Sequence, residues 1–70
     1  MENNEFGLAY NVIGVGYVET RLKRDLHSVK SIAGKAFHQP YVKSACVYDN
    51  GGVARLYLKK TPKGVVREER

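Results

Sequence analysis

The feature that most constrains the fold is a turn signal between two runs of alternating residues. The motif DNGG at residues 49–52 separates "VKSACVY" from "VARLYLKK". Asn-Gly favours a two-residue type I′ turn, because both central positions of that turn have positive φ. The pattern therefore predicts a β-hairpin over residues 42–59, in which Cys46 lies opposite Arg55.

The alternation gives this hairpin two different faces. The small, apolar face, which suits packing beneath a helix, comprises Ala45, Val47, Ala54, Leu56 and Leu58. The opposite face comprises Val42, Ser44, Cys46, Tyr48, Val53, Arg55, Tyr57 and Lys59. A slip of one residue would exchange the faces, but the apolar set fits together in only one way.

The segment "DLHSVKSIAGKAF" predicts the helix of this chain. Its apolar residues recur at steps of three and four and form one stripe: Leu26, Val29, Ile32, Ala33, Ala36 and Phe37. Asp25 is a suitable N-cap, because its carboxylate accepts hydrogen bonds from free backbone amides and favours the positive end of the helix dipole. Pro40 predicts that the helix ends soon after Phe37.

The N-terminal third leaves more than one arrangement open. Residues 6–12 alternate as a strand, glycines interrupt at positions 14 and 16, and residues 17–23 alternate again. One long strand with a glycine bulge and a hairpin of two strands both fit this pattern. A third alternative extends the helix backwards through "ETRLKRDL". We favour strand there, because "YVET" is rich in sheet-forming residues.

These elements predict an α+β fold in which one helix packs on a small antiparallel sheet, in the order strand(s)–helix–strand–strand. Val65 and Val66 indicate a further short edge strand after Pro62. Seventy residues allow a single domain, 1–70, and we expect residues 1–4 and 67–70 to be frayed.

No catalytic or metal-binding motif emerges, so we expect a protein that is not an enzyme and has no cofactor. Gly14-Val15-Gly16 lacks the third glycine of a dinucleotide fingerprint and the Gly-Lys-Ser/Thr of a P-loop. His27 and His38 have no cysteine or carboxylate at ligand spacing. Cys46 beside Arg55 would suit a reactive thiol, but a small, inert strand cysteine is the favoured interpretation.

The sequence also predicts the cellular compartment of the protein. A lone cysteine and an acidic, polar N-terminus indicate the reducing cytosol, without a signal peptide or a membrane span. A chain this short, with no disulfide or metal, is expected to gain stability by association with a partner or with a second copy as a homodimer.

The charge of +5 is concentrated in the middle of the chain, where ten Lys and Arg residues and two aspartates lie between Thr20 and Gly64. Such a field favours DNA, RNA or an acidic protein surface. The predicted partner-binding residues on the sheet face are Tyr48, Arg55, Tyr57 and Lys59. The predicted electrostatic residues on the helix side are Lys23, Arg24, Lys30 and Lys35. An ordinary solvated strand face is the alternative for the first set.

From Leu26 onward, "LHSVKSIAGKAF" followed by "VKSACVYDNGGVARLYLKKTPKG" resembles a recurrent pattern in small phage and mobile-element proteins. In that pattern a strand leads to a short Lys/Ala-rich helix and then to a hairpin with an acidic-Asn-Gly turn and a basic tail. Some type I anti-CRISPR proteins have this arrangement. The resemblance covers residues 17–66, and Val65-Val66 stands where an aromatic residue often follows the last Lys-Gly.

The resemblance implies a stoichiometric binder of a host defence or nucleoprotein complex in the host cytosol, which blocks or distorts DNA engagement through a basic surface. A direct DNA- or RNA-binding regulator, dimeric or not, is the second hypothesis, and it predicts affinity that falls steeply with salt. A structural subunit of a phage or host assembly is the third, and it predicts self-association without another ligand.

Overall fold

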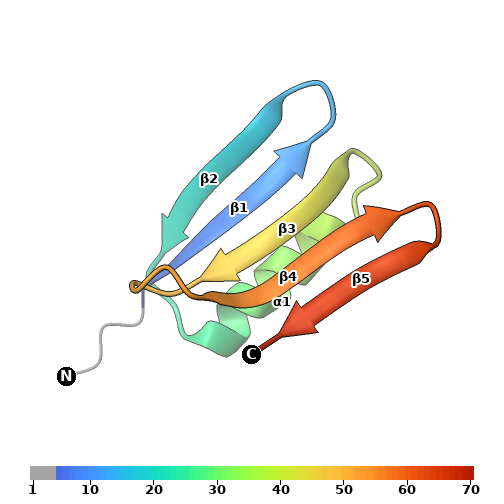
Figure 1. Ribbon diagram of the computed structural model, residues 1–70. Helices are drawn as coiled ribbons and strands as arrows, with labels where there is room; N and C mark the ends of the chain where they lie inside the picture. The colour runs from blue at the N-terminus through green and yellow to red at the C-terminus, as the bar shows by residue number, and fades with distance from the viewer. Residues whose placement is uncertain (1–4) are drawn as a thin grey trace.

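The sheet of this protein has five strands and covers most of the chain. The computed structural model describes residues 5–70. Its elements are β1 (Phe6–Val12), β2 (Gly16–Leu22), α1 (Leu26–Phe37), β3 (Val42–Tyr48), β4 (Ala54–Thr61) and β5 (Gly64–Glu69). All neighbouring strands are antiparallel, in the order β2-β1-β3-β4-β5, and α1 crosses one face (Figure 1). The predicted α+β class is confirmed.

The hydrophobic core lies between α1 and the three inner strands of the sheet, β1, β3 and β4. Its fully enclosed members are Leu8, Val29, Ala33, Phe37, Val42, Ala45, Val47, Leu56 and Leu58. The helical stripe read from three- and four-residue spacing supplies Val29, Ala33 and Phe37 to it, as predicted. Among residues 5–70, no helix has the length and apolar character that crossing a bilayer needs.

The N-terminal third is a hairpin, so the alternatives of one long strand and of a backward helix extension are both wrong. β1 pairs with β2 from Phe6 opposite Leu22 to Val12 opposite Gly16. Gly14, in the intervening turn, has a φ of 83°, a conformation that side chains with a Cβ rarely adopt. The chain reverses direction at this turn, so residues 6–22 form two paired strands and not one long strand with a bulge.

The β3–β4 turn is longer than predicted, and the two-residue type I′ assignment is wrong. Asp49 N–H donates to the carbonyl of Val53 at 3.0 Å, and Gly52 adopts a φ of 81°. A bulge follows at the start of β4, and Cys46 lies opposite Tyr57 rather than Arg55. The register therefore moves by two residues. An even shift keeps each side chain on its predicted face, so most of the face assignment survives.

Three residues of this hairpin lie elsewhere than predicted. Val42, assigned to the outer face, is 3 % exposed and belongs to the core, because a register irregularity between β1 and β3 turns it inward. Ala54, assigned to the helix side, is exposed at the first position of β4, and Val53 precedes the strand. Ala54 and Val53 lie beside the enlarged β3–β4 turn, where the alternation of a regular strand does not apply.

α1 begins at the predicted N-cap. The carboxylate of Asp25 accepts hydrogen bonds from the hydroxyl of Ser28 at 2.7 Å and from its backbone N–H at 3.2 Å. These two bonds, the hydroxyl first, lower the pKa of Asp25. The ionised carboxylate therefore stabilises the first turn of the helix.

Replacing Asp25 with alanine is expected to lower the melting temperature at pH 7. A lowered pKa means that the stabilisation is complete above the ordinary aspartate range and is lost as the pH falls through the lowered value. The difference between wild type and Asp25→Ala should thus shrink below about pH 4. Thermal unfolding followed by circular dichroism from pH 2 to pH 7 tests this. Asp25→Asn, which keeps an uncharged acceptor, is the control. A difference that stays constant to pH 2 would contradict the role of the charge.

β5 confirms the predicted edge strand and is tied back to the helix. Lys30 Nζ donates to Glu69 Oε2 at 2.9 Å, and Arg70 N–H donates to the carbonyl of Arg55 at 3.0 Å. Residues 67–69 lie in this strand, and residues 1–4 lie outside the described part of the chain. Fraying of the C-terminal residues in solution stays a prediction.

Candidate functional site

The face of the sheet opposite α1 is not covered by any other element of residues 5–70 (Figure 1). We call it the open face. Because side chains alternate along each strand, its members are the sequence neighbours of the residues that point toward α1. They are Gly7, Ala9, Asn11, Tyr17, Glu19, Arg21, Ser44, Cys46, Tyr48, Arg55, Tyr57, Lys59, Val66 and Glu68. All four predicted sheet-face residues lie on it, on the adjacent strands β3 and β4.

Tyr48 is held flat against the sheet by a glycine. A Cβ built on Gly7, its partner on β1, would overlap Cε2 of the Tyr48 ring and lie 2.7 Å from Cζ. The ring therefore occupies the space that a side chain at position 7 would need. This contact buries Gly7 and leaves Tyr48 half-buried. One side of the ring is fixed and the other is free for a partner.

The contact predicts a coupling between the two positions. Gly7→Ala should destabilise the protein by about 1–3 kcal/mol, because the ring must leave its site to admit the methyl group. In a Tyr48→Ala background the same substitution should cost close to nothing. Urea unfolding of the wild type, both single variants and the double variant measures this as a double-mutant cycle. If Gly7→Ala lowers the free energy of unfolding equally in both backgrounds, the Tyr48 ring does not occupy the space at position 7.

Two arginines flank Tyr48, and both are anchored to the β3–β4 turn. Arg21 on β2 donates from Nη2 to Oδ1 of Asn50. Arg55 on β4 lies 3.7 Å from the carboxylate of Asp49 and donates from Nε to the carbonyl of Arg70 at 3.3 Å. A guanidinium has five N–H donors, so each arginine keeps donors for a partner. The result is an oriented Arg–Tyr–Arg group at one end of the open face.

The rest of the open face carries both signs of charge. Tyr57 and Lys59 continue along β4, but Glu68 lies directly opposite Tyr57 on β5. Glu19 on β2 lies opposite Ala9 on the other side. Carboxylates therefore stand on both edge strands, and Ala9, Cys46 and Tyr57 lie on the three strands between them. The face is a mixed surface with aromatic anchors and not a uniform cationic strip.

Cys46 lies in the middle of the open face beside Tyr57. The predicted proximity to Arg55 is wrong, because the two-residue register shift replaces that neighbour. Burial raises the pKa of the Cys46 thiol. A raised pKa disfavours the thiolate, so the structure supports the interpretation of an inert strand cysteine.

The predicted helix-side cations do not form one surface. Lys23 and Arg24 lie in the connection before α1, whereas Lys35 is in its last turn, about 15 Å away at the rise of an α-helix. Lys30 is 17 % exposed at its side chain and is bonded to Glu69. Lys30 thus has a structural contact, and the others surround the helix as separate charges.

The sequence pattern assigned residues of the 42–59 hairpin alone to this face, so it did not place the β2 residues Tyr17, Glu19 and Arg21 on it. Residues 17–23 alternate in the sequence, but alternation alone does not say which of them lie on the same face as Tyr48 and Arg55. The position of Arg21 on the open face depends on the pairing of β2 with β1, which brings Arg21 opposite Gly7. Tyr17 is 68 % exposed at the far end of the same edge strand.

Comparison with known proteins adds no relative: no family model, no curated protein and no solved structure matches this chain. Within residues 5–70, no group of three or more histidine, cysteine, aspartate or glutamate side chains is placed to hold a metal ion.

Proposed function

We propose that this chain is a binding protein without catalytic activity, whose open face binds a protein surface within a host defence or nucleoprotein complex. The observation that carries the proposal is the Arg–Tyr–Arg group formed by Arg21, Tyr48 and Arg55 on a sheet face that no other element covers. Tyrosine and arginine are the residue types that dominate the binding energy of protein interfaces. The resemblance of residues 17–66 to small phage-encoded binders supplies the class of target.

The mixed charge of the open face favours a protein over a nucleic acid as its partner. Phosphates on a strand of DNA or RNA would approach Glu19 and Glu68 as well as the arginines. Carboxylates at both edges repel that backbone, whereas a protein surface offers both signs of charge. Tyr48 is already held by Gly7, so little side-chain entropy is lost when a partner packs on it.

The overall positive charge has a separate role in this proposal. A net charge of +5 attracts the acidic surfaces of a nucleoprotein-binding partner and speeds encounter. Lys23, Arg24 and Lys35 act at this stage, because they are distributed around the helix and do not converge on one ligand. Stoichiometric occupation of the partner would then block its engagement with DNA.

Direct binding of DNA or RNA is the second candidate, and the excess of lysine and arginine is the observation that favours it. It makes a different prediction about salt. Affinity for a 20-nucleotide DNA should fall log-linearly with salt concentration, with a slope set by the number of phosphates contacted. Binding to a protein through the open face should depend far less on salt.

Affinity purification of the tagged chain from cytosol of its host, with and without nuclease, tests the proposal. We expect the tagged chain to be recovered with a protein complex, in a fixed stoichiometric ratio that nuclease treatment does not change. The tagged chain should compete with DNA for binding to that complex. Recovery of nucleic acid alone, removed by nuclease, would support the second candidate and reject the first. Self-association without any partner would favour a structural subunit.

A further inference from the structure

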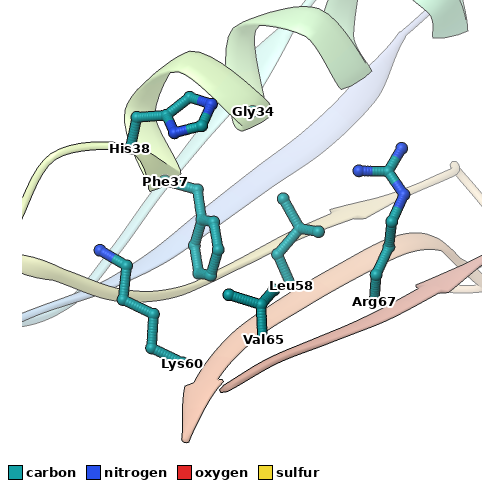
Figure 2. Close-up of a pocket in the computed structure, with 7 residues that line it drawn as sticks. All are labelled: Gly34, Phe37, His38, Leu58, Lys60, Val65 and Arg67. Carbon is teal, nitrogen blue, oxygen red and sulfur yellow. The ribbon is translucent and has the colours of Figure 1, made fainter.

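A cleft lies between α1 and the β4–β5 hairpin, on the side of the sheet opposite the open face. α1 packs chiefly on β3. On the helix side of β4, Leu56 and Leu58 are buried in the core, whereas Val65 on the helix side of β5 is exposed, so α1 leaves this edge of the sheet uncovered. The cleft has a volume of about 280 Å³. Seven residues line it: Gly34, Phe37, His38, Leu58, Lys60, Val65 and Arg67 (Figure 2).

The cleft combines an apolar floor with a cationic rim. Phe37, Leu58 and Val65 form the floor, and Val65 is 61 % exposed although it is a branched apolar residue. Lys60 and Arg67 stand on opposite sides of these three side chains (Figure 2). The seven lining residues include no carboxylate.

Both rim cations are oriented by contacts that leave donors free. Lys60 Nζ donates to the carbonyl of Gln39 at 2.8 Å and lies 4.9 Å from the centre of the Phe37 ring. Arg67 Nη2 donates to Glu69 Oε1 at 2.9 Å. Glu69 also accepts from Lys30, so one carboxylate is shared between two cations and positive charge remains at the rim. Lysine has three N–H donors and arginine five, so both can bind an anion as well.

Gly34 gives the cleft its depth. Glycine in the middle of a helix costs about 1 kcal/mol relative to alanine. A Cβ at this position would meet no atom within 4 Å, so close packing inside the chain does not require glycine. The helix therefore lacks the stability that alanine at position 34 would add, and the space above the helix at Gly34 stays open. That space is accessible from the outside along the edge strand β5.

We propose that this cleft binds an apolar side chain with a neighbouring carboxylate, presented by a protein partner, such as phenylalanine beside aspartate or glutamate. The volume of about 280 Å³ suits one large side chain and lies just below the range of about 300–1,000 Å³ of drug-sized ligand sites. The floor accepts the apolar group, and Lys60 and Arg67 select the carboxylate. The inference does not rest on the open face, because the two surfaces lie on opposite sides of the sheet.

Titration of the ¹⁵N-labelled protein with the peptide acetyl-Asp-Phe-Glu-amide, followed by NMR, tests the proposal. We expect shift changes at Gly34, Leu58 and Arg67, and at least tenfold weaker binding of the neutral peptide acetyl-Asn-Phe-Gln-amide. Equal binding of both peptides, or shifts spread over all basic residues, would overturn it. Binding of free 3-phenylpropionate without binding of the acidic peptide would also overturn it, since the site would then serve a small molecule.

Two variants locate the binding. Gly34→Leu fills the cleft and improves helix propensity, so peptide binding should be lost while the melting temperature is unchanged or higher. Arg67→Gln should weaken binding of the acidic peptide about tenfold. Lys63→Gln makes the same change in charge in the β4–β5 turn, outside the cleft, and should leave the affinity for the peptide unchanged. Full binding by a folded Gly34→Leu protein would disprove the assignment.

Discussion

Leu56→Ala is expected to leave about half of the protein unfolded at 25 °C. Leu56 is 2 % exposed and lies on β4 at the core, opposite Val47. Removing a buried leucine side chain costs about 2–5 kcal/mol, because apolar contacts are lost and a cavity remains. A core in a chain below about 80 residues rarely supplies more than about 3–5 kcal/mol. The loss therefore matches the whole stability of the fold.

Far-ultraviolet circular dichroism with urea titration measures this effect. Val53→Ala is the control, because Val53 is 46 % exposed beside the β3–β4 turn and its truncation should change stability by less than about 0.5 kcal/mol. A Leu56→Ala protein with the urea midpoint of the wild type would show that the core between α1 and the sheet is not what holds the fold together.

Arg55→Glu combined with Tyr57→Ala is expected to weaken binding to the captured partner by at least 100-fold. Arg55 belongs to the Arg–Tyr–Arg group, and Tyr57 is the next residue along β4 whose side chain lies on the open face. Truncating an interface anchor costs about 2 kcal/mol or more, and reversing a charge adds repulsion to the lost contact. A loss of 2.7 kcal/mol corresponds to about 100-fold in affinity. Surface plasmon resonance with the purified partner gives the two dissociation constants.

Lys63→Glu combined with Tyr41→Ala is the matched control. It makes the same change in charge and removes one tyrosine, but Lys63 lies in the β4–β5 turn and Tyr41 precedes β3, both off the open face. Tyr41 is 52 % exposed, so its loss should leave the fold intact. If both double variants bind the partner alike, overall charge and not the open face governs binding. Unchanged affinity of the Arg55/Tyr57 variant would reject the assignment of this face.

The two surfaces differ in how far the sequence anticipates them. Tyr48, Arg55, Tyr57 and Lys59 were placed on one face by alternation alone, and the structure places them together. The cleft above Gly34 was not anticipated from the sequence. Its rim combines Lys60 and Arg67 from different strands, and their separation depends on the β4–β5 pairing, in which Lys60 faces Val65 and Leu58 faces Arg67.

The sequence by itself determined the features that depend on local periodicity. The three- and four-residue spacing of Val29, Ala33 and Phe37 defined the buried side of α1, and Asp25 defined its start. Alternation defined the buried positions Val47, Leu56 and Leu58, because each strand needs an apolar side toward the helix. An even error in register left these faces intact, since the side-chain period in a strand is two.

Only the tertiary structure decided the features that depend on pairing between distant segments. β1 lies between β2 and β3, which places Gly7 beneath Tyr48 and Arg21 within reach of Asn50. A bulge in β3 turned Val42 inward, and the longer β3–β4 turn with the bulge in β4 gave Cys46 a new neighbour. The position of α1 chiefly over β3 left the helix side of the edge strand β5 open. Local propensity contains no information on these choices, because they follow from how all five strands and the helix share one small core.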